Sequence, residues 1–266
     1  MSLIYPQLGP KAQRGSKPRC HILTDGTRAQ VAARLSALTG NTAIVAPTDV
    51  WLPEGFVNLK EAELDKAAEF DAVISACHRA ALRAWWLGSP SIPAQTPTWD
   101  IASTCTIDGR PGMLLVEAKA HDNEFLAELK GRSLGNTAAA RIARFPSHLT
   151  IGRAISDASA HLQLNSNHPI ALSRDHAYQL SNRFAWSWKL AELGIPVVLV
   201  YLGFLNANDV LGSLQPKLAR LGTPFPTSDA WTSLVKTRAA HIVAPKVWGS
   251  TIDIHGTPFI PMLATL

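Results

Sequence analysis

The stretch TWDIASTCTIDGRPGMLLVEAKA, residues 98–120, decides the fold of this chain. Two runs of strand-forming residues flank the dipeptide Asp108-Gly109. An Asp-Gly dipeptide between two such runs is typical of a β-hairpin. We therefore predict two antiparallel strands, which would bring Asp100 and Glu117 to the same end of the pair.

Two charged residues, Glu117 and Lys119, close this stretch directly after an apolar run. Successive residues of a strand point to opposite sides, so residues two apart project from one face. With Asp100 on the neighbouring strand, this end of the hairpin would present two carboxylates and an ammonium group. Mg²⁺ suits such a place, because it usually takes one or two carboxylates and leaves its other positions to water and substrate phosphate.

The order Asp100, then Glu117-Ala118-Lys119, resembles the D…(D/E)-x-K signature of the PD-(D/E)XK nuclease superfamily, which has a restriction-endonuclease-like fold. The resemblance covers residues 58–205 and implies a core of a helix, an antiparallel three-stranded unit, a second helix and another strand. It implies that Asp100 and Glu117 hold Mg²⁺ or Mn²⁺, that the main-chain carbonyl of Ala118 completes the protein ligands, and that Lys119 is catalytic. A Mg²⁺-dependent nuclease is the activity implied, with DNA favoured over RNA.

Some members of this superfamily also use polar residues on the helix after E-x-K, often a glutamine. Gln179 stands in that place and is the catalytic candidate on this helix, with Asn182 and Arg183 as candidates for substrate binding. His121 follows the motif closely and is a further candidate to contact substrate. A polar loop that leaves a strand is an equally ordinary interpretation of His121.

The chain departs from the family pattern at two points. Trp99 stands directly before Asp100, where the proline that gives the family its name would be. An unusually long segment also separates Lys119 from the predicted helix over 174–193.

Two other acidic positions compete for a role in the site. A second E-x-K triplet, Glu128-Leu129-Lys130, lies in a helical-looking stretch without a buried strand before it, and we interpret it as a solvated helix face. Glu69 could add a third acid, as helix carboxylates do in part of the superfamily, but other glutamates nearby favour a solvated face there too.

Helical and strand patterns alternate along the rest of the chain, which indicates an α/β fold. Residues 58–87 lack proline and glycine and predict one long helix, and 174–193 predict an amphipathic helix. The almost wholly apolar run 195–204 follows at once, as in a central strand covered on both sides. The remaining predictions are helices over 27–40, 125–130, 137–143, 154–162 and 227–243, and strands over 42–47 and 257–266.

We expect a mixed central sheet flanked by helices, with a restriction-endonuclease-like core and N- and C-terminal extensions. Residues 1–57 would form an arm and a small α/β extension, and residues 58–266 the nuclease-like domain, together one compact unit. Within the arm, residues 9–19 are rich in glycine, proline and positive charge. They predict a loose solvated terminus, with a phosphate-contacting tail as the alternative. Residues 88–97 predict a turn-rich link.

The composition is that of a packed globular protein, with 47% apolar and 17% charged residues. A net charge of +5 permits an acidic partner such as nucleic acid but does not require one. The three cysteines are odd in number and lack C-x-x-C spacing, which indicates a reducing cytoplasm. The longest apolar run, 195–205, is too short to cross a bilayer, so we expect no membrane association.

Several chemistries lack a motif in this chain. There is no H-x-x-x-H or H-E-x-x-H pattern for zinc, no G-x-G-x-x-G, no Walker loop and no G-x-S-x-G. Two functions stay open beside the nuclease: a non-catalytic nucleic-acid-binding or interaction module with a vestigial site, and an enzyme acting on a small molecule. The structural alternative is a surface ion pair of Glu117 with Lys119, with Asp100 capping a turn. A homodimer also stays open.

Overall fold

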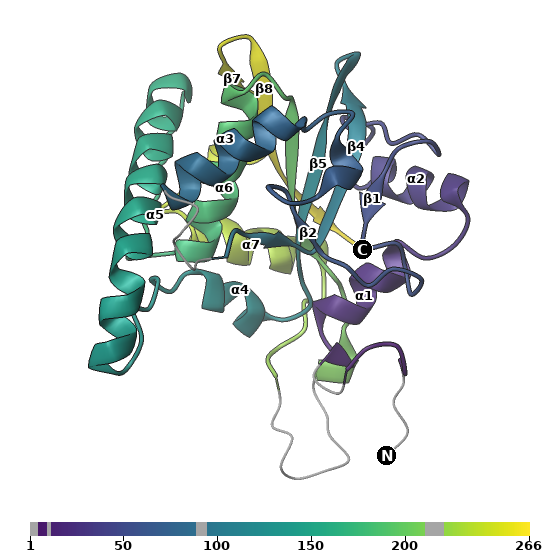
Figure 1. Ribbon diagram of the computed structural model, residues 1–266. Helices are drawn as coiled ribbons and strands as arrows, with labels where there is room; N and C mark the ends of the chain where they lie inside the picture. The colour runs from purple at the N-terminus through teal and green to yellow at the C-terminus, as the bar shows by residue number, and fades with distance from the viewer. Residues whose placement is uncertain (1–4, 10–11, 89–94, 211–220) are drawn as a thin grey trace.

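A six-stranded mixed sheet runs through the centre of the molecule in the order β1-β4-β5-β6-β8-β7 (Figure 1). The computed structural model describes residues 5–9, 12–88, 95–210 and 221–266. The strands of the sheet are β1 (Trp51–Leu52), β4 (Ile101–Ile107), β5 (Arg110–Lys119), β6 (Val197–Gly203), β7 (Ile252–Ile254) and β8 (Thr257–Thr265). A separate two-stranded sheet consists of β2 (Ala62–Glu63) and β3 (Thr98–Trp99).

Helices flank the central sheet, which confirms the predicted α/β class. The α-helices are α1 (Ser16–Leu23), α2 (Arg28–Ala37), α3 (Ala76–Leu87), α4 (Asp122–Glu128), α5 (Ala138–Asn165), α6 (Tyr178–Glu192) and α7 (Ser228–Arg238). Short 3₁₀ helices are η2 (Ala68–Phe70), η3 (Asn208–Val210) and η4 (Pro245–Val247). Among the residues described, no helix is both long and apolar enough to cross a bilayer.

The predicted hairpin is confirmed as β4 and β5, which pair antiparallel with Ile101 opposite Val116. The two residues of its turn, Asp108 and Gly109, have φ values of 49° and 74°. Positive φ at both central positions matches the right-handed twist of the flanking strands, which is why Asp-Gly forms the turn. β1 adds to the outer edge of β4 in the antiparallel sense, with Trp51 opposite Ser103.

β6 is the central strand that the apolar run predicted, and all of its residues are buried. It pairs parallel with β5 on one side and with β8 on the other. A parallel pair needs a crossover connection, and α4, α5 and α6 lie along the chain between β5 and β6. The result is an antiparallel unit, β1-β4-β5, that continues into parallel strands.

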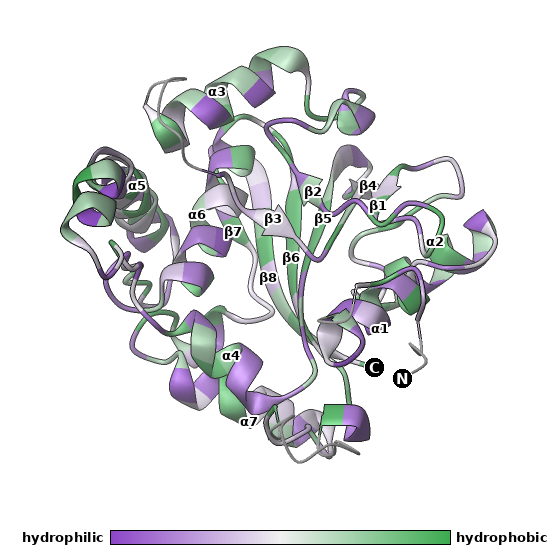
Figure 2. Ribbon diagram, turned by 60° about the horizontal axis from the view of Figure 1, so that its bottom comes forward, coloured by the Kyte–Doolittle hydropathy of each residue, from purple (hydrophilic) through white to green (hydrophobic). Residues whose placement is uncertain are grey.

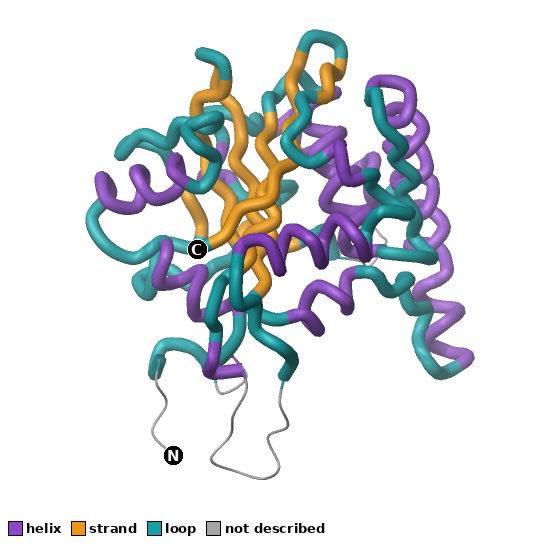
Figure 3. The backbone as a smooth tube through the Cα atoms, turned by 180° about the vertical axis from the view of Figure 1, so that it is seen from behind, coloured by secondary structure: helices purple, strands orange, loops and turns teal. Residues whose placement is uncertain are grey.

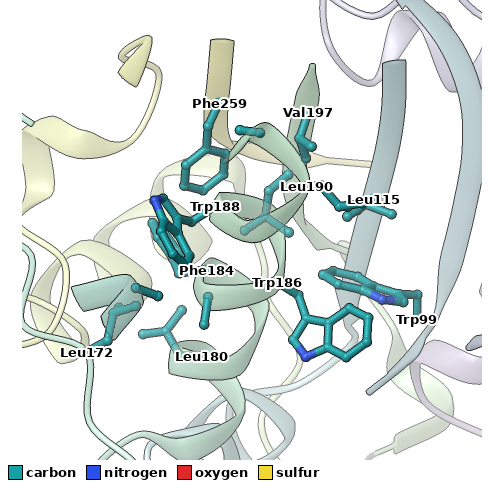
Figure 4. Close-up of a cluster of buried hydrophobic side chains, with 14 of the residues drawn as sticks. Trp99, Leu115, Leu172, Leu180, Phe184, Trp186, Trp188, Leu190, Val197 and Phe259 are labelled. Carbon is teal, nitrogen blue, oxygen red and sulfur yellow. The ribbon is translucent and has the colours of Figure 1, made fainter. Parts of the chain in front are cut away.

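Two helical layers cover the two faces of the sheet. α1 and α2 lie on one face and α3, α5 and α6 on the other, as the views from front and back agree (Figures 1 and 3). The strands between them are predominantly apolar (Figure 2). On the α6 face the core includes several aromatic residues, seen in Figure 4 with Leu115, Val197 and Phe259 of the strands around Phe184, Trp186 and Trp188 of α6.

The helix predicted over 58–87 is wrong in its first part. Ala62 and Glu63 pair with β3, where Ala62 lies opposite Trp99. The α-helix begins only at Ala76, where the side chain of Ser75 accepts a hydrogen bond from the backbone of His78. Tertiary pairing has overridden the helix propensity of the alanine-rich sequence. The serine N-cap was the local signal for the later start.

Other boundaries also differ from the sequence predictions. The strand predicted over 42–47 is only an isolated bridge between Ile44 and Thr106. The two helical pieces predicted at 137–143 and 154–162 are parts of one helix, α5, which continues through Pro146.

The predicted loose arm, residues 9–19, is also partly wrong. The helix α1 begins at Ser16, and it tolerates Pro18 because the first turn needs no backbone donor. Residues 10–11 of the arm and 89–94 of the predicted link lie outside the described residues.

Candidate functional site

Glu117 and Lys119 lie at the C-terminal end of β5 and point to the same face of the sheet, as predicted. The Lys119 Nζ atom is 2.5 Å from Glu117 Oε1. Their side chains are nearly inaccessible, and the two residues are only 4% and 7% exposed. The pair is therefore buried, and the alternative of a surface ion pair is wrong.

Arg183 reaches Glu117 from α6, the helix that packs over this face. Its Nε atom donates to Glu117 Oε2 at 2.5 Å, and one Nη atom donates to the Thr98 carbonyl oxygen at 2.8 Å. The guanidinium also lies over the ring of Trp99, 4.6 Å from its centroid. Both carboxylate oxygens of Glu117 are thus held by cations, Lys119 on one side and Arg183 on the other.

Glu128 extends this network of charged side chains beyond Lys119. Its Oε1 lies 2.5 Å from Lys119 Nζ, and its Oε2 accepts a hydrogen bond of 2.9 Å from the hydroxyl of Tyr201 on β6. Glu128 is completely buried, so its interpretation as a solvated helix face is wrong. A signal was present, because the apolar Phe125 lies three residues earlier and therefore on the same face of α4. Phe125 is buried as well.

Asp100 lies beside this network at the bend between β3 and β4. Its Oδ2 accepts a hydrogen bond of 2.8 Å from the backbone amide of Ala118. The predicted proximity of Asp100 to the end of β5 is therefore confirmed. Asp100 is more exposed than Glu117 or Lys119. Its carboxylate bonds to the neighbouring strand, which also disagrees with a role limited to capping a turn.

The two carboxyl groups of the motif titrate very differently. Burial raises the pKa of Asp100 to about 7, and the negative charge of Glu117 adds to this effect. Burial would also raise the pKa of Glu117, but the charges of Arg183 and Lys119 outweigh it and lower that pKa to about 2. Glu117 is hence ionised at neutral pH and balanced by two cations, whereas Asp100 retains its proton up to about pH 7.

The ends of the network show the same competition between burial and charge. Burial raises the pKa of Glu128 to about 8, although Lys119 opposes that shift. Burial alone would lower the pKa of Lys119, but Glu117 and Glu128 raise it well above its usual range. Lys119 therefore keeps its positive charge at neutral pH.

The carboxylates of Asp100 and Glu117 are the groups here that could hold a divalent cation. No cluster of three or more His, Cys, Asp or Glu side chains with metal-binding geometry occurs in the part of the chain that the structure describes. Two carboxylates suffice for Mg²⁺, which keeps several water ligands. Asp100 has no ion-pair partner among the described residues and could accept a cation in place of its proton, whereas Glu117 would have to share its oxygens with Lys119 and Arg183.

The structure places the other predicted site residues at varying distances from this cluster. Asn182 is buried and accepts a hydrogen bond of 3.3 Å from Arg183. Gln179 is exposed in the first turn of α6, with no side-chain hydrogen bond to another described residue. His121 is buried at the N-terminus of α4, where its Nε2 lies 3.5 Å from Glu124 Oε1. Glu69 lies on the exposed surface and pairs with Lys60 at 2.7 Å.

Two surface hollows lie elsewhere, with volumes of about 380 and 420 Å³. Neither is lined by Asp100, Glu117 or Lys119. An enzyme acting on a small molecule would be favoured if the largest pocket of the molecule lay away from Asp100. Strongly shifted pKa values are the better marker of chemistry, however, and the large shifts at carboxyl groups occur at Asp100, Glu117 and Glu128.

Comparisons with known proteins found no relative of this chain. No family model matches the chain, and no curated protein or solved structure matches it. A functional assignment therefore depends on the residues of the site and their geometry.

Proposed function

We propose that this protein is a metal-dependent phosphodiester hydrolase that prefers DNA. The observation that carries the proposal is the contact of Asp100 with the backbone of Ala118, between Glu117 and Lys119. This contact brings the two parts of the D…E-x-K pattern together at one strand end. The order α3, hairpin β4–β5, α6 and parallel β6 also supports the proposal, although β1, the third strand of the antiparallel unit, lies before residue 58.

The residues of the cluster have distinct roles in this proposal. Asp100 and Glu117 would hold Mg²⁺ or Mn²⁺, which when bound activates a water molecule and stabilises negative charge on the phosphate. Lys119 orients that water or offsets the charge that develops on the phosphate. Arg183 and Glu128 are positioning residues, because they fix Glu117 and Lys119 through the contacts of 2.5 Å.

Cleavage of defined substrates tests the proposal. We expect wild-type protein to cleave single- or double-stranded DNA with Mg²⁺ or Mn²⁺, and the Asp100→Asn variant to lose at least about 100-fold of that rate, the scale of removing a group that stabilises transition-state charge. The substituted asparagine retains a side-chain oxygen for the Ala118 amide, so the fold should survive. The control variant is Glu69→Gln, which removes an exposed carboxylate and should cleave normally.

The result that contradicts the proposal is a folded wild-type protein that leaves single- and double-stranded DNA and RNA intact with both metals. Equal rates for wild type and Asp100→Asn would also contradict it, because a contaminating nuclease would then be the source of cleavage.

A non-catalytic nucleic-acid-binding module is the second candidate, and one observation favours it. Both oxygens of Glu117 already have cationic partners at 2.5 Å, as in a buried structural ion network. Such a module would bind an oligonucleotide but neither cleave it nor bind Mn²⁺. Cleavage by wild type separates the two candidates.

A further inference from the structure

In the segment 129–156, between the site residue Glu128 and Asp157, every charged residue is basic. The segment contains five basic residues and no aspartate or glutamate, in a protein whose net charge is +5. The basic residues are Lys130, Arg132, Arg141, Arg144 and Arg153. This segment is part of the long insertion that separates Lys119 from the second core helix of the resemblance.

The charge of this segment is not neutralised inside the protein. None of its five cations forms an ion pair with another residue that the structure describes. The three arginines of α5, Arg141, Arg144 and Arg153, are exposed. Cations without acidic partners attract a polyanion, whose binding releases condensed counterions.

An apolar stripe runs along the same exposed part of α5. Ile142, Phe145 and Leu149 are 76%, 51% and 40% exposed. Their spacing of three and four residues places them on one side of the helix. The helical repeat places Arg141 and Arg153 beside this stripe, whereas Arg144 projects from another side of the same exposed turns.

A hollow lies at one end of this stripe, between α5 and residues 172–175. It has a volume of about 380 Å³, and its lining includes Leu149, Arg153, Ser156, Arg174 and the acidic Asp175. The hollow therefore joins one end of the apolar stripe to two guanidinium groups, of which Arg174 is paired with Asp175. Arg153 is the guanidinium of this lining that has no acidic partner among the described residues, so it is the group here that could contact a phosphate.

The basic segment starts at the candidate site. Lys130 lies two residues after Glu128, which contacts Lys119. Its carbonyl oxygen accepts a hydrogen bond of 2.9 Å from the backbone of Tyr178, the first residue of the helix that carries Arg183. α5 then lies at the outer edge of the molecule, beyond α6 (Figure 1).

We infer that the exposed part of α5 around the stripe Ile142, Phe145 and Leu149, with Arg141 and Arg153 beside it and Arg144 on the adjacent side, binds single-stranded nucleic acid. The arginines contact the phosphates, and Phe145 stacks on an unpaired base. Aromatic side chains within a positively charged surface are the usual means of holding a single strand. This inference rests on the proposed function, because it assigns the bound strand to the same site. It makes the insertion the element that holds the substrate.

Binding measured without metal separates this inference from the proposed activity. Fluorescence anisotropy of a labelled single-stranded oligonucleotide in EDTA reports affinity when no cleavage occurs. We expect the variant Arg141→Gln/Arg144→Gln/Arg153→Gln to bind at least about tenfold more weakly. Its slope of log affinity against log salt should be smaller by about 2, since each phosphate contact on a single strand contributes about 0.7.

Phe145→Ala tests the stacking contact independently of charge. We expect about a tenfold loss of affinity with an unchanged salt slope, because stacking on one base is worth on the order of 1–3 kcal/mol. The matched charge control is Lys236→Gln/Arg238→Gln/Lys246→Gln, which removes three cations from α7 and η4. It should bind almost as wild type. Circular dichroism establishes that each variant is folded.

Three results would overturn the inference. They are equal weakening by the two triple variants, tighter binding of duplex than of single strand, and binding of wild type to phosphatidylserine vesicles but not to the oligonucleotide. If the α5 variants lose binding while wild type never cleaves, the inference stands and the proposed hydrolase fails. If wild type cleaves and the α5 variants bind normally, the proposed hydrolase stands and this inference fails.

Discussion

Glu117 is a buried carboxylate whose negative charge is balanced by two neighbouring cations. It is an acid with almost no access to water, and it is kept ionised by Lys119 and Arg183 in contacts of 2.5 Å. A buried ion network of this kind adds little net stability when complete, but the loss of one member leaves an unpaired charge in the interior. The arrangement therefore makes each member necessary to the others.

Arg183→Ala tests this dependence. We expect the free energy of unfolding to fall by about 3–5 kcal/mol, because Glu117 loses one of its two cations inside the protein. Urea denaturation measures the change. Lys60→Ala removes one partner of the exposed ion pair with Glu69 and should cost less than about 1 kcal/mol. Similar small effects of the two substitutions would show that the interior tolerates the unpaired Glu117.

Asp100 predicts a pH dependence of stability. Its pKa is raised from 3.8 to about 7 in the folded protein, so the folded state binds the proton more tightly than the unfolded state. The stability from this group is therefore fully present below the unfolded pKa of 3.8 and is lost as pH rises through about 7. Asparagine does not titrate.

The measurement is the free energy of unfolding of wild type and Asp100→Asn in EDTA between acidic and mildly basic pH. The variant should gain stability relative to wild type as pH rises through this interval. A difference between the two proteins that stays constant with pH would show that Asp100 has an ordinary pKa.

At the scale of elements, the hairpin β4–β5 and the strand β6 could be predicted because their signals are local. The Asp108-Gly109 turn fixes the hairpin, and the hairpin in turn places Asp100 beside the end of β5. The first part of the region 58–87 could not be predicted in this way. Its alanine content favours a helix, while its pairing with β3 depends on Trp99, far along the chain.

Part of the candidate site could likewise be predicted from the sequence, and part of it could not. The alternation of a strand is enough to predict that Glu117 and Lys119 share a face. The partners of these residues come from α4, α6 and β6, and their meeting depends on how the crossover packs. The contact between Glu128 and Lys119 was therefore missed, although Phe125 marked the buried face of α4. Tyr201 lies within an almost wholly apolar run, so nothing in the sequence indicated that its hydroxyl donates to Glu128.

Gly203 at the end of β6 predicts an effect of close packing between elements. It lies opposite Lys119 in the parallel register, and a Cβ atom there would lie 2.6 Å from the ring of Trp231 on α7. Gly203→Ala should reduce the free energy of unfolding by about 1–3 kcal/mol, because the tryptophan must shift within a packed core. Chemical denaturation measures the loss. Gly9→Ala meets no atom within 4 Å and should have little effect, so equal costs would contradict the packing.

At the scale of the whole molecule, burial is unevenly distributed. The sheet is covered on both faces by α-helices, while residues 138–146 at the start of α5 are largely exposed (Figure 1). Regions with few buried apolar contacts open at a low free energy, and central strands open only with global unfolding. The molecule thus combines a well-buried sheet with an exposed first part of α5, which is the surface that we infer to bind single-stranded nucleic acid.

Hydrogen exchange followed by mass spectrometry tests this distribution. Peptides from β5 and β6 should exchange slowest, and the first turns of α5 should exchange much faster. Addition of a single-stranded oligonucleotide should slow exchange in α5 and leave β6 unchanged. Uniform protection across α5 and the strands without oligonucleotide would contradict the expected looseness of this helix.

The central claim is that Asp100 and Glu117 together hold a divalent cation, and Mn²⁺ binding tests it most directly. The experiment is isothermal titration of metal-free protein above the pKa of Asp100, with wild type and Asp100→Asn compared after circular dichroism has shown equal folding. We expect one Mn²⁺ site in wild type that is lost in Asp100→Asn. Equal Mn²⁺ binding by both proteins, or none by wild type, would contradict it.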